Sequence, residues 1–120
     1  MGVVVSIPYN EIRDSVRGLD DYVHRIYEGR RYQIAEEFID LCTPFVPVKT
    51  GNLRLGASIV DNGYAVEWSA INPKNGFDYA PRQYYEYFYH PIDGSDHWDE
   101  EMLLYEGDTF YERVKGILER

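Results

Sequence analysis

The stretch that most constrains the fold is the nonapeptide Val46–Arg54, with the sequence VPVKTGNLR, near the middle of the chain. Proline lacks a backbone N–H, so Pro47 and the nearby Pro44 prevent a helix from continuing into this stretch. Each proline also favours an extended conformation for the residue before it, which is Thr43 or Val46. The nonapeptide therefore predicts a corner between an upstream helix and a downstream strand.

Within the nonapeptide, Thr50-Gly51-Asn52 is typical of a tight turn. Glycine adopts positive φ without strain, and asparagine tolerates it or bonds the local backbone. In a following strand, alternation would direct Leu53 into a core and leave Arg54 at the surface. Turn residues mark geometry first, so a connector without chemistry is the simplest interpretation. The structural turn motif consists of Pro47, Thr50, Gly51, Asn52, Leu53 and Arg54.

The sequence before the nonapeptide predicts a short strand followed by helices. Val3–Ile7 is a β-prone run, typical of an edge strand or of an arm that adds to a neighbour's sheet. Asn10 is a favourable N-cap for a helix from Glu11, in which apolar residues recur every three or four positions. Gly29 and the two arginines after it predict a break before a second helix; one long helix kinked near Gly29 is the alternative.

After the nonapeptide, the pattern changes to strands and then to a final helix. Leu53–Val60 and Tyr64–Ser69 are typical of two strands, and the Asp61-Asn62-Gly63 sequence between them is a strong hairpin signal. Phe77–His90 is dense in aromatic residues and has features of both a helical turn and a strand. Trp98–Glu119 has the apolar spacing of a closing helix. Gly107-Asp108 near its middle would divide it in two, with Asp108 as the cap of the final helix, in the alternative interpretation.

Together these segments predict a single α+β domain over residues 1–120. It would contain an N-terminal helix or helix pair, a small antiparallel β-sheet and a C-terminal helix that closes over the sheet. A length of 120 residues suits one domain, and 44% hydrophobic with 28% charged residues is ordinary for a globular protein.

Composition also excludes several classes of protein. A formal net charge of −9 opposes tight nucleic-acid binding, because such binding needs clustered lysine and arginine. The single cysteine, Cys42, permits no internal disulfide, and its apolar position in the helix pattern predicts that it is buried. No stretch approaches the ~20 apolar residues of a membrane span, and the first residues lack the pattern of a signal peptide. We therefore expect a cytoplasmic site of synthesis.

Few residues suggest chemistry. His90 and His97 flank Asp93 and Asp96, a combination that could hold a divalent metal, but the spacing matches no metal-binding loop. The sequence contains no glycine-rich phosphate loop and no nucleophile elbow. We therefore expect no metal, no cofactor and no catalytic residues, and hence a protein that is not an enzyme. A small metal-dependent or other enzyme centred on His90–Asp99 is the alternative.

Several short motifs, taken in order, resemble one family. The matching residues are Pro47, Val48, Thr50, Gly51, Leu53 and Arg54, then Tyr79-Ala80, Gln83-Tyr84-Tyr85 and His97-Trp98. Their order and spacing, over roughly Ala35 to Met102, resemble the small minor capsid and head–tail joining proteins of long-tailed bacteriophages. Many relatives carry Gly-Thr after the Tyr-Ala segment, where this chain has Phe88-Tyr89-His90-Pro91. This departure leaves the subfamily open.

The resemblance implies a structural virion protein that joins head to tail at the neck, by head closure or tail completion, as a ring of subunits. Its partners would be portal, adaptor or head-closure proteins on one side and tail-tube or tail-terminator proteins on the other. DNA would pass through the ring without specific binding. The protein would be assembled in the host bacterial cytoplasm and would lie at the neck of the virion. An acidic module that binds a basic protein partner is a further alternative.

Residue roles follow from these expectations. Twelve tyrosines supply large apolar bodies with polar tips, which suit interfaces as well as cores. The candidate interface residues are Tyr84, Tyr85, Tyr87, Tyr89, Val3, Val4 and Val5. The expected core anchors are Trp68 and Trp98. We expect Trp98 to begin the closing helix, to bury its ring against the sheet and to hydrogen-bond its indole N–H.

Overall fold

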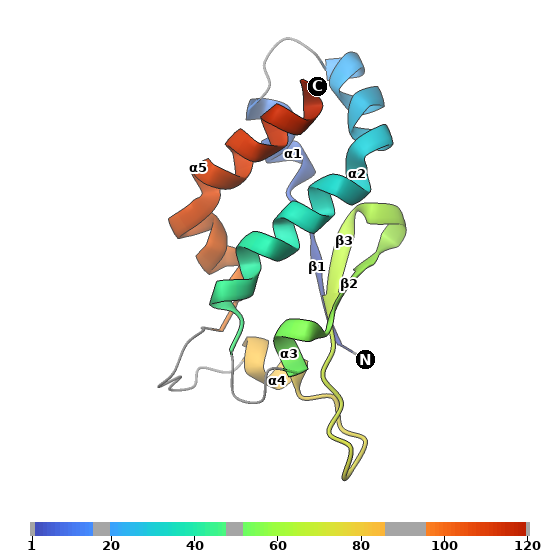
Figure 1. Ribbon diagram of the computed structural model, residues 1–120, viewed down its shortest axis with the longest axis vertical. Coiled ribbons are helices and arrows are strands. Elements are labelled where there is room, and N and C mark those ends of the chain that lie inside the picture. Colours follow the sequence, from blue (N-terminus) through green and yellow to red (C-terminus); the bar gives the residue numbers. More distant parts are fainter. Residues whose placement is uncertain (1, 16–19, 48–51, 86–95, 120) are drawn as a thin grey trace.

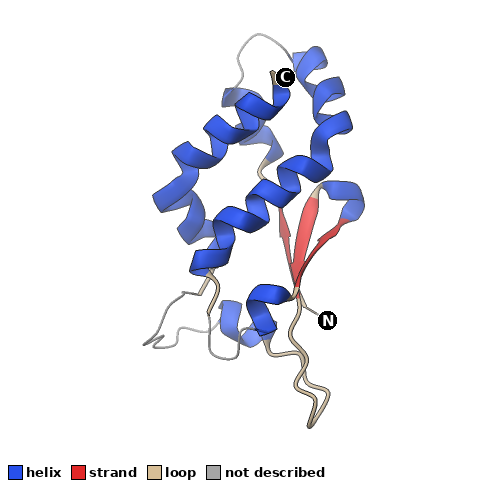
Figure 2. Ribbon diagram, viewed as in Figure 1, coloured by secondary structure: helices blue, strands red, loops and turns tan. Residues whose placement is uncertain are grey.

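The computed structural model describes residues 2–15, 20–47, 52–85 and 96–119 (Figure 1). Its elements are β1 (Val3–Ser6), α1 (Tyr9–Ser15), α2 (Asp20–Cys42), η1 (Thr43–Phe45), α3 (Asn52–Leu55), β2 (Ala57–Val60), η2 (Asp61–Gly63), β3 (Ala65–Trp68), α4 (Ala80–Tyr85) and α5 (Trp98–Leu118). The long helices α2 and α5 pack together, and a small antiparallel sheet lies against them (Figure 2). The predicted α+β class is confirmed.

The sheet has three strands in the order β1-β3-β2, so β3 is central. Both pairings are antiparallel, and they place Val5 and Ile59 on either side of Val66. Trp68 shares this face of the sheet, and its ring contacts Phe38 of α2, with ring centroids 6.5 Å apart. The face that carries Val66 and Trp68 therefore builds the core, and the edge-strand interpretation of the N-terminal run is confirmed.

The hairpin predicted around Asp61-Asn62-Gly63 is present, but its first strand is shorter than expected. The backbone turns through positive φ at these three residues, with values of 54°, 55° and 92°. The first strand begins at Ala57, because Asn52–Leu55 forms the short helix α3. Leucine and arginine are good helix formers, and a turn of helix buries Leu53 in the core just as an inward strand position would. The prediction that Leu53–Val60 is one strand is therefore wrong over its first half.

The break between the N-terminal helices also lies elsewhere than predicted. Helix α1 begins at Tyr9, ahead of the Asn10 cap, and α2 runs without interruption through Gly29. A Cβ added at Gly29 would meet nothing within 4 Å, so this glycine faces open space. Its cost of about 1 kcal/mol is small beside the burial of Tyr27 and Ile34 on the same helix. Figure 1 shows the light-blue first turns of α2 at an angle to the remainder, but α1 is a separate helix, so the alternative of one long kinked helix holds only from Asp20 onward.

Helix α2 ends at Cys42, two residues before Pro44. Val46 is extended, with φ −79° and ψ 132°, as the following proline predicts. Thr43 is not extended, because it continues the chain as the first residue of the 3-10 helix η1. Its hydroxyl donates a hydrogen bond of 2.7 Å to the carbonyl of Ile39, which holds it to the end of α2. The local bond thus outweighs the preference that Pro44 imposes.

Helix α5 is the expected closing helix, and Trp98 begins it. It continues through Gly107, which is buried, so the glycine does not interrupt it. Phe110 of α5 packs against Phe38 of α2, with ring centroids 5.5 Å apart. Arg113 adds a peripheral ion pair with Glu37, at 3.1 Å. Within the described ranges, no helix combines the length and the apolar character that crossing a bilayer requires.

The molecule is elongated, with extents of 50 × 26 × 20 Å. Helices α3 and α4 lie at one end of the long axis, together with a loop that projects beyond them (Figure 1). The last turns of α5 lie toward the opposite end. The two ends therefore present different elements to any partner.

Candidate functional site

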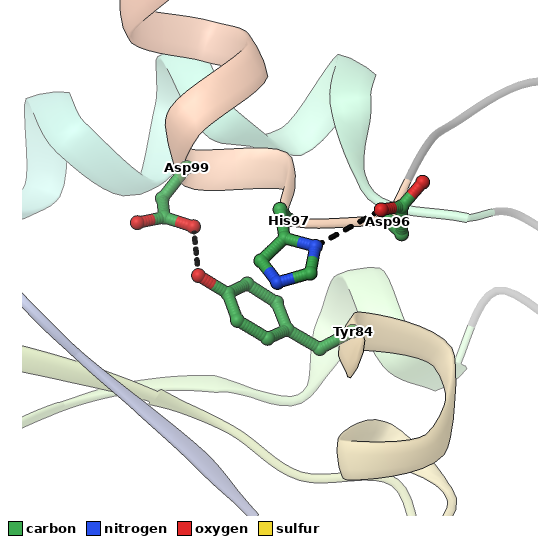
Figure 3. A network of polar contacts seen from close by, with 4 residues as sticks. All are labelled: Tyr84, Asp96, His97 and Asp99. Atoms are coloured by element: carbon green, nitrogen blue, oxygen red, sulfur yellow. Dashed lines mark hydrogen bonds and ion pairs between the residues drawn. The ribbon is translucent and has the colours of Figure 1, made fainter. Parts of the chain in front are cut away.

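A cluster of four polar and aromatic residues joins α4 to the start of α5 (Figure 3). The hydroxyl of Tyr84 donates a hydrogen bond to a carboxylate oxygen of Asp99. The Tyr84 ring lies beside the His97 ring, with centroids 4.6 Å apart. The backbone N–H of His97 donates a hydrogen bond of 3.1 Å to the backbone carbonyl of Tyr84. The Nδ1 atom of His97 is 2.9 Å from an Asp96 carboxylate oxygen. The cluster fastens two segments that are separated in sequence by residues 86–95.

The electrostatics of this cluster favour a structural role over a catalytic one. Burial raises the pKa of Tyr84 well above its usual range, and the hydrogen bond and negative charge of Asp99 raise it further. The hydroxyl therefore stays protonated at neutral pH and acts as a hydrogen-bond donor. His97 occupies the left-handed region, with φ 44°, immediately before α5. This conformation turns the chain sharply into the helix.

Both predicted core anchors are fully buried beneath the cluster. The rings of Trp68 and Trp98 meet edge to face with centroids 5.8 Å apart, and Trp98 lies 4.9 Å from Tyr84. Among the described residues, neither indole N–H has a hydrogen-bond partner. The expectation that the Trp98 N–H is hydrogen-bonded is therefore not met within the described part of the chain. The Trp98 ring makes edge-to-face contacts with the rings of Trp68 and Tyr84.

The second candidate site is a hairpin-like loop of residues 70–79, which we call the arm; it projects from the α3–α4 end (Figure 1). Its two sides are joined by a bridge between Ile71 and Asp78 and by a bond of 2.8 Å from the Asn72 N–H to the Phe77 carbonyl. Three Asx side chains, Asn72, Asn75 and Asp78, each accept a hydrogen bond from the backbone N–H two residues later. These bonds fix the arm internally.

Asp78 anchors the base of the arm. Its carboxylate accepts bonds from the Ser69 hydroxyl at 2.6 Å, from the Ala70 N–H at 3.1 Å and from the Ala80 N–H at 3.0 Å. Burial alone would raise the pKa of Asp78, but these three donors outweigh it and hold the pKa below its usual range. The anchored arm exposes two apolar side chains, Ile71 at 50% and Phe77 at 56%.

The residues of the turn motif are placed only in part. Pro47 and Leu53 are buried, so the inward direction of Leu53 is confirmed although its element is a helix. Arg54 is half-buried and donates to the carbonyls of Val46, at 2.8 Å, and Pro44, at 3.1 Å. It therefore ties α3 back to the corner. Thr50 and Gly51 lie outside the described residues, and only the backbone of Asn52 is described, as the start of α3.

The structure divides the candidate interface residues into two groups. Three of them belong to the core of this chain, namely Tyr84, Val3 and Val5. Two are exposed, namely Tyr85 at 65% and Val4 at 56%. Tyr87 and Tyr89 lie outside the described residues. Val4 and Tyr85 are therefore the described candidates that a partner can reach.

The described residues give little support to a metal site or to a reactive cysteine. No group of three or more histidine, cysteine, aspartate or glutamate residues there is arranged to hold a metal ion. His90 and Asp93 lie outside those ranges. Cys42 is buried, as predicted, and burial followed by the charge of Asp99 raises the pKa of its thiol. The thiol therefore stays protonated and unreactive at neutral pH.

The arm was not identified from the sequence. A readable signal was present, because Asx residues recur at positions 72, 75 and 78, and each favours a bond to its own backbone two residues on. Leu55 on α3 and Leu104 on α5 were also missed as exposed apolar residues. They leave no comparable signal, because apolar residues at helical positions are usually buried.

Comparison with known proteins gives no match: no protein family, no curated protein and no solved structure is significantly similar to this chain.

Proposed function

We propose that this chain is a structural virion protein of a long-tailed bacteriophage, which joins head to tail at the neck as one subunit of a ring. The observation that carries this proposal is where the family-like residues lie. Leu53, Ala80, Tyr84 and Trp98 come from four separate motifs, and all are buried in the same core. Helices α3 and α4, which contain residues of the first three motifs, lie at the same end of the molecule (Figure 1). The motifs thus build one scaffold.

That scaffold supports docking better than catalysis. It holds the arm through Asp78, next to the buried Ala80, and it presents Leu55, Phe77 and Tyr85 as exposed apolar side chains around it. Exposed apolar residues on a rigid base are typical of protein–protein contacts. The Tyr84 hydroxyl is held as a hydrogen-bond donor to Asp99. The function is therefore assembly, without a cofactor and without turnover.

In this role the protein sits between two partner rings in the virion neck. One face meets portal, adaptor or head-closure subunits, and the other meets tail-tube or tail-terminator subunits. The different ends of the elongated molecule suit two different partners. A net charge of −9 opposes tight binding of DNA phosphates, which suits a ring through which DNA passes.

Deleting the gene from the phage that encodes it tests the proposal. We expect capsids and tails to form but to accumulate unjoined, or as heads that lose their DNA, when the lysate is viewed by electron microscopy. A plasmid copy of the gene should restore joined, infectious particles, which controls for effects on neighbouring genes. Normal infectious particles without the gene would refute a joining role. A lysate without capsids would refute it as well and would indicate a role in shell assembly.

A further inference from the structure

Helix α5 exposes an apolar surface that the described residues do not cover. Leu104 is 72% exposed and Tyr105 is 69% exposed. Phe45 stacks on Tyr105, with centroids 6.3 Å apart and planes within 6°, which props the tyrosine ring at the surface. Glu100, Glu101 and Asp108 lie within one helical turn of this pair and form an acidic rim. We call Leu104, Tyr105 and these three carboxylates the α5 surface.

The arm has the complementary character. Ile71 and Phe77 are exposed, and Lys74 is exposed at the turn between them. The other charged residue of the arm is Asp78, whose carboxylate is occupied by the hydroxyl and N–H donors at the base. The arm therefore presents apolar groups with a positive charge, whereas the α5 surface presents apolar groups with negative charges.

These two surfaces lie apart in one molecule, so they can meet only between molecules. Figure 1 shows the arm projecting from the α3–α4 end, away from the middle of α5. We propose that the arm of one copy docks on the α5 surface of the next copy, with Lys74 facing the acidic rim. A contact between two different surfaces is heterologous, and it closes into a ring when the rotation per copy permits. The inference rests on the proposed function, since it names the contact that would build the ring.

Charge explains why one such contact is weak. Copies of a chain with net charge −9 repel each other overall. The contact between Lys74 and the acidic rim opposes this repulsion only locally. Repeated around a ring on a template, modest contacts act together. An experiment on the free protein therefore has to trap brief encounters.

Disulfide trapping does this with positions beside the surfaces, so that the surfaces themselves stay intact. One chain carries Pro73→Cys next to Lys74, and a second chain, made longer by a tag, carries Thr109→Cys one turn after Tyr105. Native Cys42 is fully buried and does not compete. Mixed and mildly oxidised, the two chains should form a mixed disulfide at least about tenfold more than in a control with Ser58→Cys, exposed on β2, in place of Thr109→Cys.

Two results would overturn the inference. Equal yields from Thr109→Cys and from the Ser58→Cys control would mean that the arm does not select α5. Efficient self-linking of Pro73→Cys chains alone would mean that arms pair with each other, in an isologous contact.

Charge reversal then tests the electrostatic part. Adding Lys74→Glu to the Pro73→Cys chain should reduce the mixed disulfide to the level of the Ser58→Cys control. Adding Glu101→Lys and Asp108→Lys to the Thr109→Cys chain should restore it. The matched control is Glu36→Lys with Asp40→Lys, which changes the charge equally at two exposed positions on α2 and should restore nothing. Equal rescue by both pairs would contradict the proposed contact, because net charge alone would then explain the yield.

The failure of this contact can be told apart from failure of the joining role. If phage without the gene fails to join heads to tails, but a copy with Lys74→Glu restores joining fully, the contact is wrong and the function stands. If phage without the gene is normal, the function is wrong, and the trapping experiment still decides whether copies meet through the arm and α5.

Discussion

At the scale of single residues, Asp78 is the group whose protonation matters most for the arm. Its folded pKa lies below the ordinary value of about 3.9. Its contribution to stability is therefore complete above that pH, and it is lost as the pH falls through the folded pKa. Neutralising the carboxylate weakens three hydrogen bonds at once, one from a hydroxyl and two from backbone N–H groups.

We expect Asp78→Ala to lower the free energy of unfolding by about 1–2 kcal/mol at pH 7, the scale for partly exposed charge-assisted bonds. Asp78→Asn should cost less, because its amide oxygen still accepts one or two of the bonds. Urea titrations at several pH values measure both changes. The difference between the native protein and Asp78→Asn should stay constant above about pH 5 and shrink below about pH 4. A constant difference down to pH 2 would contradict the role given to the carboxylate.

Trp98 tests the aromatic core at the same scale. It is fully buried between Trp68 and Tyr84, so Trp98→Ala should cost about 3–5 kcal/mol through lost contacts and a cavity. Trp98→Phe should cost clearly less, since the indole N–H has no partner among the described residues and its loss breaks no bond there. Thermal unfolding measures both variants. Equal costs would mean that the indole N–H makes a contact beyond the described residues.

At the scale of elements, two glycines predict opposite effects of the same substitution. Gly29 lies inside α2 with open space around it, so Gly29→Ala should stabilise the protein by about 0.5–1 kcal/mol. Gly63 closes the β2–β3 hairpin at φ 92°, and a Cβ there would lie 2.8 Å from the Arg31 side chain. Gly63→Ala should therefore destabilise by about 1–3 kcal/mol. Circular dichroism melts of both variants check the signs, and stabilisation by Gly63→Ala would contradict the described turn.

The elements also explain how far the sequence could be read. Apolar spacing located α5 from Trp98 onward and the burial of Cys42, because both follow from periodicity alone. The α3 helix and the unbroken α2 could not be read this way. In each, a local preference, the strand pattern after Asn52 or the glycine at position 29, is outweighed by burial of neighbouring apolar groups. Tertiary packing of this kind is not encoded in any short window.

In the candidate site too, some positions could be predicted from apolar spacing and others could not. The burial of Leu53, Trp68 and Trp98 was predictable, because large apolar residues at periodic positions belong in a core. The exposure of Tyr105 was not, since its spacing in α5 equals that of buried neighbours, and its ring rests on Phe45 from a distant segment. Tyr105 is thus an exposed apolar residue suited to docking that periodicity assigns to the buried side.

At the scale of the whole molecule, the core is continuous from the sheet to α5. Phe38 contacts both Trp68 and Phe110, so one side chain of α2 links the sheet to the closing helix. We expect unfolding to be a single cooperative transition. Tryptophan fluorescence, which reports the buried Trp68–Trp98 pair, and far-ultraviolet circular dichroism, which reports the helices, should give the same midpoint in urea. Two separate midpoints would mean that the helical pair and the sheet are independent units.

The bond between Tyr84 and His97 has a consequence for the sequence between them. The backbone carbonyl of Tyr84 accepts a hydrogen bond of 3.1 Å from the backbone N–H of His97, so these two residues lie side by side although residues 86–95 lie between them in the sequence. Residues 86–95 connect two positions that are already joined, and lengthening this connection changes no distance that the rest of the chain must span. Loop-closure cost grows only by about 0.6 kcal/mol per doubling of length. Lengthening the sequence between these two residues should therefore add little to the entropic cost of bringing them together.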